Sequence, residues 1–559
     1  MKKLVAAILA ASMLAGTLTA CSGGQTASES QSAPEQSEST GAAEGGTRFL
    51  NIQNETGVDS LDPQIATDAR SHELLGTFLE GLCTIDADGN VVPALAESYE
   101  VSEDGLTYTF HLRDALWSNG DPVTANDFVF AWQRALSTDV ASEYAFMLYE
   151  VAQLKNSQAI ADGEMDPSEL GVRAEDDKTL VAELENPVVF FPSLTAFPTF
   201  FPVNEAFYDS CNGSFATSPD TLLSCGPYIV TEFDPAATTY RVEKNDQYWD
   251  AENVSLAGIS FQVISDNQTS LLSFQNGEMD VVRIGGEQVE LVRDDPAFSV
   301  LPFAGYLWYL SLNMEGVEAL DNLNMRKAIY YAIDRDLLAN NVLADGSDPA
   351  TYLVPTNLAN GPDGQDYRAT GPEYEGGDEA KATEAYNLAC QELGQNEFSF
   401  EMTIEDTDTC AKVAAFLQDQ IQTKLPGVII SIRTVSRKQL NDDMRAGEYN
   451  IGLTRWGADY LDPMTFLALW KTGASNNFGG WSNAEYDAIL DDCTTGTLAT
   501  DAQGRWDALH DAEQIAMNDC EVIPLYETHS CVLQNPNVTG LTFQPYGILR
   551  NYKYVTINE

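Results

Sequence analysis

The stretch that decides the fold class runs from residue 408 to residue 463 and ends in Thr454-Arg455-Trp456-Gly457-Ala458-Asp459-Tyr460-Leu461-Asp462-Pro463. Its first part, 408–424, has apolar residues on one side at helical spacing, and Pro426-Gly427 then breaks the pattern. Residues 428–435 are apolar and largely β-branched, which predicts a strand. This alternation of helix and strand predicts an α/β fold.

A second helix and strand lead directly into the decapeptide. Residues 436–446 predict a short helix that Gly447 closes. Apolar residues then alternate with Asn450 and Gly452, which predicts a strand over 449–453. The resulting β-α-β unit places the loop at the carboxyl end of a parallel strand, where open α/β sheets bind their ligands.

The decapeptide itself allows two interpretations. It combines two aromatic rings, a cation and acidic residues within one turn, which suits a ligand site. Alternatively, Trp456 and Tyr460 are core residues, and Asp459 caps a helix that begins near Met464. Spacing alone does not decide between these interpretations.

Length and charge limit the classes of protein that the chain can be. The chain has 559 residues, of which 44% are hydrophobic and 10% aromatic, so it is globular and long enough for two or three domains. Its 29 Lys+Arg and 85 Asp+Glu give a formal net charge of -56. Nucleic acid is excluded as a partner because no basic surface exists to neutralise phosphates. Anionic membrane surfaces would repel the folded body too.

The N-terminus predicts an address outside the cytoplasm. Lys2-Lys3 precedes an apolar stretch over 4–14, and Leu18-Thr19-Ala20-Cys21 resembles a lipobox. We therefore expect a signal peptide over 1–20 and a lipid on Cys21 that anchors the protein to the outer face of the cell membrane. A transmembrane anchor is the alternative, but the apolar stretch is short for one. Residues 21–47 are predicted to form a flexible linker after the lipidated cysteine.

Eight cysteines remain besides Cys21, an even number that permits disulfides outside the cytoplasm. Cys211 and Cys225 flank a loop rich in Gly, Ser and Pro and are the predicted pair, while the sequence leaves the full connectivity open. No C-x-x-C spacing occurs and the chain has four His, so neither a zinc site nor any other cofactor is predicted.

Further elements are predicted along the chain. Residues 49–53 and 106–112 predict strands, and residues 71–82 have a helical apolar face. A helix opens at Thr124, where Asp127 completes a capping box. One more helix, packed on one face, is predicted from apolar residues at four-residue spacing, namely Met325, Ile329, Ile333 and Leu337.

Several motifs together resemble the oligopeptide-binding, family 5 extracytoplasmic solute-binding proteins of ABC transporters. Tyr108-Thr-Phe-His-Leu-Arg113 and Trp117-Ser-Asn-Gly-Asp-Pro-Val-Thr124 resemble the family signature. Arg326 to Arg335 (RKAIYYAIDR) resembles the helix of its last large domain, and Ala458-Asp459-Tyr460 matches near the end. The matches occur in order along most of the chain, from Leu61 to Tyr526, which makes the resemblance far more specific than any single motif.

The resemblance implies a two-lobed α/β fold of the periplasmic-binding-protein kind, with an extra inserted domain and a hinge between the lobes. Lobe one is expected to comprise 48–80, 205–305 and 528–559. The inserted domain is expected over 81–204, and lobe two over 306–527. A ligand would lie between the lobes and close them by hinge motion.

The resemblance also assigns ligand-binding roles. The family's Trp-x-Ala-Asp-Tyr stretch carries an Asp that pairs with the terminal ammonium of a peptide, and Asp459 stands at that position here. Trp456 matches an aromatic residue of the pocket wall. Residues 64–69 align with a segment that supplies main-chain contacts, in which Thr67 and Ala69 are the candidate residues.

Two tyrosines are further candidates from the resemblance. Tyr144 matches a tyrosine that reaches the peptide from the inserted domain, and Tyr526 is a candidate residue of the pocket wall. Ordinary packing explains both tyrosines equally well.

The chain departs from the family where the peptide carboxylate is bound. Family members use cationic side chains there, and the aligned positions hold Cys410, Met444 and Leu453. An aromatic position of the family is Arg437 here. Arg445 and Arg455 are nearby replacements for the lost cations, although a salt bridge to a local acid explains Arg455 equally well.

The function that the resemblance implies is capture of short peptides, without turnover, for an ABC permease and its ATPase subunits. A monomer is expected that meets the membrane only through its lipid anchor. Two alternatives stay open. The same fold could bind a nickel chelate, haem, an oligosaccharide or a signalling peptide. A secreted hydrolase is the second alternative, against which stands the absence of G-x-S-x-G and H-E-x-x-H motifs.

Overall fold

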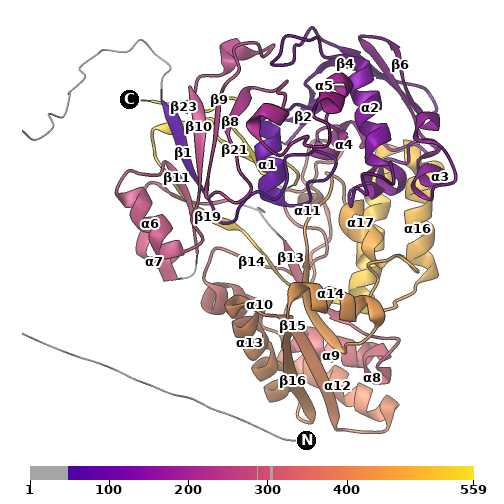
Figure 1. Cartoon of the computed structure of the whole chain (residues 1–559). Coiled ribbons are helices and arrows are strands. Elements are labelled where there is room, and N and C mark those ends of the chain that lie inside the picture. Colours follow the sequence, from indigo (N-terminus) through magenta and orange to yellow (C-terminus); the bar gives the residue numbers. More distant parts are fainter. Residues whose placement is uncertain (1–47, 88, 286, 302–305, 545, 559) are drawn as a thin grey trace, which may run out of the picture. The chain divides into compact units, whose positions relative to one another are not determined.

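The computed structural model describes residues 48–558 except 88, 286, 302–305 and 545 (Figure 1). The predicted signal peptide, the lipidated Cys21 and the linker lie outside the described residues. None of the helices in the described part of the chain is both long and apolar enough to cross a membrane.

A mixed sheet of seven strands is built from three distant segments of the chain. Its central strand pairs in parallel with both neighbours, and all other pairings are antiparallel. Leu50 and Ile52 of the central strand are fully buried. In order across the sheet, the strands are β12 (Phe298–Leu301), β19 (Ser530–Gln534), β11 (Val281–Ile284), β1 (Phe49–Asn54), β10 (Gly258–Val263), β9 (Thr239–Lys244) and β8 (Tyr228–Glu232).

A second sheet, of six strands, contains the stretch that predicted the fold class. The strand β15 lies between β16 and β17 and pairs in parallel with both, as the β-α-β pattern requires. Figure 1 shows α13 (Asp408–Lys424) beside β15 and β16, and α14 (Arg437–Ala446) then leads to β17. The strand order is β14 (Asp348–Pro349), β18 (Val522–Glu527), β13 (Leu307–Leu312), β17 (Ile451–Trp456), β15 (Phe398–Glu405) and β16 (Val428–Val435).

The strand that was predicted over 449–453 extends to Trp456 in the structure. The reason is its neighbour β13, which pairs antiparallel with β17 and holds Arg455 opposite Trp308 and Trp456 opposite Leu307. Arg455 and Trp456 are therefore held by a sheet rather than by a loop.

An antiparallel sheet of four strands lies within residues 96–183. The helix α2 (Ala125–Ala135) begins at the predicted capping box, where the Thr124 N–H donates to Asp127 Oδ2 over 2.8 Å. The indole of Trp117 donates to the same oxygen over 3.2 Å. The strand order is β4 (Ala96–Val101), β5 (Thr107–Leu112), β7 (Thr179–Glu183) and β6 (Val172–Asp176).

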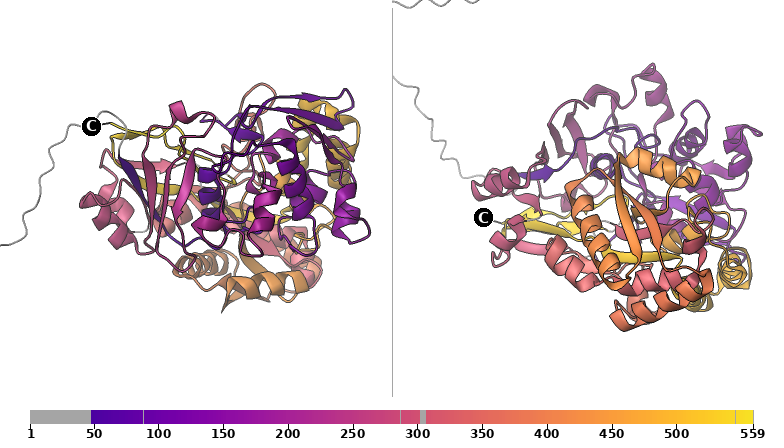
Figure 2. Two further views of the ribbon diagram at one scale, coloured as in Figure 1. Left: turned by 45° about the horizontal axis from the view of Figure 1, so that its top comes forward. Right: turned by 90° about the horizontal axis from the view of Figure 1, so that it is seen from below.

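The remaining larger helices are spread along the chain. They are α1 (Ala69–Phe78), α6 (Asn267–Gln275), α9 (Leu323–Ala332), α12 (Glu379–Leu393), α16 (Ala484–Thr495) and α17 (Ala502–Asp519). The chain passes from the six-stranded to the seven-stranded sheet between β18 and β19, and Figure 2 shows these C-terminal strands in yellow.

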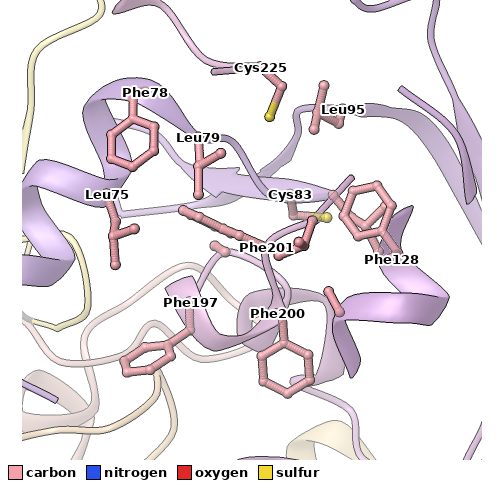
Figure 3. Packing of buried hydrophobic residues seen from close by; sticks show 14 of the residues in the cluster. Leu75, Phe78, Leu79, Cys83, Leu95, Phe128, Phe197, Phe200, Phe201 and Cys225 are labelled. Atoms are coloured by element: carbon pink, nitrogen blue, oxygen red, sulfur yellow. The ribbon is translucent and has the colours of Figure 1, made fainter. Parts of the chain in front are cut away.

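Aromatic residues fill the core around α1. Figure 3 shows Leu75 and Phe78 of this helix, and Leu79 directly after it, in one cluster with Phe197, Phe200 and Phe201. The segment 194–201 is therefore packed against α1. This helix follows the segment 64–69, which is predicted to supply main-chain contacts to a ligand.

Two helix predictions were wrong in their bounds. α1 begins at Ala69, capped by Asp68, and ends at Phe78 rather than at residue 82, since Leu79 has an extended backbone. α9 ends at Ala332, and Asp334 caps a new short helix, α10 (Arg335–Leu337). Leu337 is therefore 39% exposed instead of lying on the predicted apolar face.

The predicted disulfide between Cys211 and Cys225 is not formed in this structure, where all eight described cysteines are free. Cys225 is held in the core because its backbone N–H donates to the Phe78 carbonyl (Figure 3). Cys211 lies at the end of α5 (Glu205–Ser210) and is half-buried, so the two thiols face different environments.

Candidate functional site

A cavity of about 640 Å³ brings together residues from distant parts of the chain. This volume falls within the roughly 300–1,000 Å³ that is typical of ligand pockets. Six of the seven predicted ligand-binding residues line it, namely Thr67, Ala69, Tyr144, Arg455, Trp456 and Asp459.

Tyr526 is the predicted residue that does not line this cavity. It is 1% exposed and stacks on Trp308, with ring centroids 5.7 Å apart and planes 15° from parallel. Ordinary packing therefore describes the position of Tyr526.

Asp459 carries an unpaired carboxylate in the cavity wall. Within the described residues, no cation lies within ion-pair distance of its oxygens and no hydrogen bond to them forms. Burial raises the pKa of Asp459 to about 7. An unpaired carboxylate in such a place is costly to ionise, so a bound cation would be strongly favoured.

The alternative in which Asp459 caps the next helix is wrong. The residue that accepts the Met464 N–H is Asp462, over 3.0 Å. Asp459 instead donates its own N–H to Thr465 Oγ1 over 2.9 Å, which fixes its backbone and leaves its carboxylate free.

A buried ion pair holds the rest of the loop. Asp462 accepts two hydrogen bonds from Arg505, over 2.7 and 2.8 Å, and both residues are 5% exposed. A bidentate pair of this kind fixes geometry as well as charge. The carboxylate of Asp459 is therefore presented by a rigid turn.

Trp456 lines the cavity and carries a hydrogen-bond donor that has no partner among the residues that the structure describes. Its ring is half-buried, and its indole N–H is buried without a partner within the described residues. Buried polar groups without partners are rare in folded proteins and often mark a site that a ligand completes.

Tyr144 lies in an aromatic cluster beside Asp459. Its ring stacks on Phe197 with centroids 5.2 Å apart, and His72 lies edge-on at 5.6 Å. Burial, together with the charge of Asp459, raises the pKa of Tyr144. Tyr144 thus both packs in this cluster and lines the cavity.

Arg455 and Arg437 form a cationic part of the cavity wall with Glu405. Arg455 lies 2.5 Å from Glu405 Oε2, whereas Arg437 lies 4.0 Å from the same oxygen and 3.4 Å from the Thr454 hydroxyl. Burial and the charge of Arg455 lower the pKa of Arg437. One carboxylate is thus shared by two guanidinium groups, which leaves an excess positive charge.

Arg455 pairs with an acid and also lines the cavity, so its role as a replacement for the lost cations stays a prediction. Glu405 was not predicted, although a signal existed. It ends β15, and Arg455 lies near the end of the adjacent parallel strand β17, so the strand order brings both residues to the same edge of the sheet.

The opposite charges of this cavity lie close together. Asp459 follows Arg455 by four positions, so their Cα atoms are at most roughly 14 Å apart. The other two arginines of the wall are already paired, Arg283 with Glu55 at 2.8 Å and Arg70 with Glu73 at 2.5 Å. The cavity therefore suits a small molecule with a cation at one end and an anion at the other.

Comparison with known families gives a match over residues 90–478, to the family described as bacterial extracellular solute-binding proteins, family 5 Middle. Among curated proteins, the oligopeptide-binding protein OppA of Bacillus subtilis (strain 168) is 33% identical over 507 residues. That alignment covers 89% of this chain and 90% of the relative.

Solved structures show the same similarity to oligopeptide-binding proteins. The substrate-binding domain of an oligopeptide ABC transporter from Bacillus anthracis str. Ames superposes with a TM-score of 0.75 at 36% identity, over 92% of this chain and 99% of that chain. Listeria monocytogenes OppA bound to peptide gives a TM-score of 0.75 at 32% identity, over 92% of this chain and 100% of that chain.

Proposed function

Because the chain belongs to family 5 of the bacterial extracellular solute-binding proteins, we propose that it captures short peptides and delivers them to the permease and ATPase subunits of an ABC importer. The observation that carries this proposal is the unpaired carboxylate of Asp459 in a cavity that also holds the arginine pair Arg437 and Arg455. A free peptide has the matching ends, an ammonium and a carboxylate.

Asp459 binds the terminal ammonium of the peptide. Within the described residues its carboxylate has no counter-charge, so the ligand supplies one. Leaving a charge unpaired in a closed site costs several kcal/mol, so this arrangement selects ligands with a free amino terminus.

Arg437 and Arg455 bind the carboxylate at the other end. Glu405 neutralises only one of the two guanidinium groups, so the second is available to an anion.

The middle of the peptide is held through its backbone. Thr67 and Ala69 supply main-chain groups at the edge of the cavity, and the Trp456 indole N–H supplies a donor. Contacts of this kind do not depend on the identity of ligand side chains, which bridging waters can accommodate.

The division into lobes supports capture by closure. Lobe one is 48–80, 205–305 and 528–559, the inserted domain is 81–204, and lobe two is 306–527. All strands of each larger sheet fall within one of these groups. The connecting segments touch where the Thr528 N–H donates to the Tyr306 carbonyl over 2.9 Å, which makes this pair a candidate hinge.

The proposal also includes a lipid anchor on Cys21 and a monomeric protein. A lipid on Cys21 keeps the protein at the outer face of the cell membrane, and the linker 22–47 lets the body reach the permease. The protein acts as a monomer, uses no cofactor and releases its ligand chemically unchanged.

Native mass spectrometry of protein purified from its host tests the proposal. The expected result is a co-purified mass of a short peptide, and calorimetry should show one-to-one binding of that peptide. A cargo without an amino group, such as a chelate or an oligosaccharide, would contradict the proposal. Cleavage of the peptide on incubation would contradict the binding-only function.

A further inference from the structure

Phe190 and Tyr460 stack face to face, with ring centroids 4.8 Å apart and planes 8° from parallel. Phe190 follows β7 in the proposed inserted domain, whereas Tyr460 directly follows Asp459 in proposed lobe two. This stack is an aromatic contact between those two parts of the protein, and the proposed peptide contacts do not use it.

The backbone of Phe190 is rigidly held on its own side. Both the N–H and the hydroxyl of Ser193 donate to the Phe190 carbonyl, over 2.9 and 2.7 Å. The N–H of Phe191 donates to the Val188 carbonyl over 3.0 Å. A ring on such a turn is presented in one direction and loses little further freedom when it stacks.

Tyr460 is equally fixed on the other side. It is 8% exposed, and its carbonyl accepts the Asp462 N–H over 3.0 Å. Asp462 is in turn held by Arg505, whose guanidinium carbon lies 5.7 Å from the centroid of the Phe190 ring. Phe190 thus contacts a connected unit that includes the backbone of the Asp459 loop.

We propose that Phe190 is a positioning residue that holds the Asp459 loop in place through Tyr460 and thereby slows the release of bound peptide. The proposal rests on the peptide-binding function proposed above. Release requires the inserted domain and lobe two to separate, and the stack must break when they do. Its free energy therefore adds to the barrier for dissociation rather than to the rate of encounter.

Dissociation kinetics provide the first test, with Phe190→Ala compared with Val189→Ala. Val189 is the exposed neighbour and serves as the matched control. Stopped-flow measurement with a dipeptide or tripeptide should show dissociation roughly two- to tenfold faster for Phe190→Ala, with the association rate nearly unchanged. Phe190→Tyr, which keeps the ring, should restore slow dissociation, whereas Phe190→Leu, which keeps only apolar volume, should not.

Hydrogen exchange of the ligand-free protein provides the second test and needs no peptide. The backbone amides of residues 458–462 should exchange faster in Phe190→Ala than in Val189→Ala. Faster exchange without faster dissociation would overturn the proposal, because the stack would then be structural only. Exchange and dissociation equal to the control would overturn it as well. If the wild-type protein binds no peptide, the proposed function fails, while hydrogen exchange still reports whether Phe190 positions the loop.

Discussion

The guanidinium of Arg455 lies 2.5 Å from the carboxylate of Glu405, and this single acid is shared with Arg437. The same group of three side chains therefore explains why an arginine can line a ligand cavity without being free. It also makes the ligand's anionic end testable, because the acid and the ligand compete for the same two cations.

Replacing Arg437 with Gln should weaken binding of peptides that carry a free carboxylate by about tenfold or more, because a charge-assisted hydrogen bond contributes about 1.5–3 kcal/mol. Peptides with an amidated C-terminus should be affected little. Calorimetric Kd values for both peptides measure this difference. Arg445→Gln, an exposed arginine at the other end of the same helix, is the control. Equal losses for both peptides would show that Arg437 does not contact the carboxylate.

Replacing Glu405 with Gln should strengthen binding of the ligand carboxylate and destabilise the fold. Both arginines then lack their shared acid, so affinity for a free carboxylate should rise several-fold. The two guanidinium groups would repel each other, and the free energy of unfolding should fall by about 1–3 kcal/mol. Denaturant unfolding and calorimetry on one preparation measure the two effects. Weaker peptide binding by Glu405→Gln would contradict the claim that Glu405 and the peptide carboxylate compete for the same two arginines.

Peptide affinity should depend on pH through Asp459. Burial raises the pKa of this carboxyl to about 7, so at pH 5.5 only about 3% of the empty protein carries the charge that an ammonium needs. The amino terminus of a peptide is itself only partly charged at pH 8, so apparent affinity should be about tenfold weaker at pH 5.5 than at pH 8, and binding at the lower pH should release a proton. Calorimetry in buffers of different ionisation enthalpy detects that proton. A peptide affinity that stays constant between pH 5.5 and pH 8 would contradict the assignment of Asp459 as the partner of the ammonium.

Stability should depend on pH through His529, which lies between β18 and β19. Burial alone lowers the pKa of this imidazole, but the hydrogen bond to Glu527 and the charges of Glu527, Asp348 and Asp345 outweigh burial and raise it. His529 Nε2 lies 3.3 Å from Glu527 and 3.7 Å from Asp348.

The direction of the effect follows from the raised pKa of His529. Because the folded protein holds this proton more tightly, the stabilisation is complete below the unfolded pKa of about 6.5 and is lost as pH rises through the folded pKa. The destabilisation caused by His529→Gln should therefore be larger at pH 5.5 than at pH 9, as chemical unfolding at both pH values will show. A difference that is constant with pH would mean that the proton does not stabilise this connection.

Local signals were sufficient to predict the elements around the site. The helix over 408–424 and the strand over 428–435 have the predicted bounds, because Thr407 caps the helix and Pro426-Gly427 separates the two elements. Gly447 closes the next helix with a φ of 69°, a conformation that glycine adopts without strain. In contrast, the end of α9 was missed, since Asp334 caps a new helix inside a continuous apolar pattern.

The composition of the cavity could be predicted only in part. Asp459 and Trp456 came from the family resemblance and lie in the cavity wall. Two residues that contact the cavity wall from behind, Glu405 beside Arg455 and Phe190 beside Tyr460, were missed because such contacts depend on strand order and on distant segments, which periodicity does not encode. Tyr526 was a candidate residue of the pocket wall, but its ring packs on Trp308 in the core and does not line this cavity.

The central claim is that Asp459 is the partner of a ligand ammonium. It is tested most directly by a double-mutant cycle that combines Asp459→Asn with N-acetylation of the peptide. Asp459→Asn should fold, and at pH 8 the empty variant should be at least as stable as the wild type, because ionising the buried carboxyl of the wild type costs stability above its raised pKa. A normal unfolding curve for the variant therefore excludes misfolding as the cause of any loss in affinity.

The measurement is the Kd of the free and the acetylated peptide for both proteins at pH 8. Acetylation should weaken binding to the wild type by about 100-fold or more, and should change binding to Asp459→Asn by less than about threefold. If acetylation weakens binding equally in both proteins, Asp459 is not the ammonium partner and the account of this site is wrong.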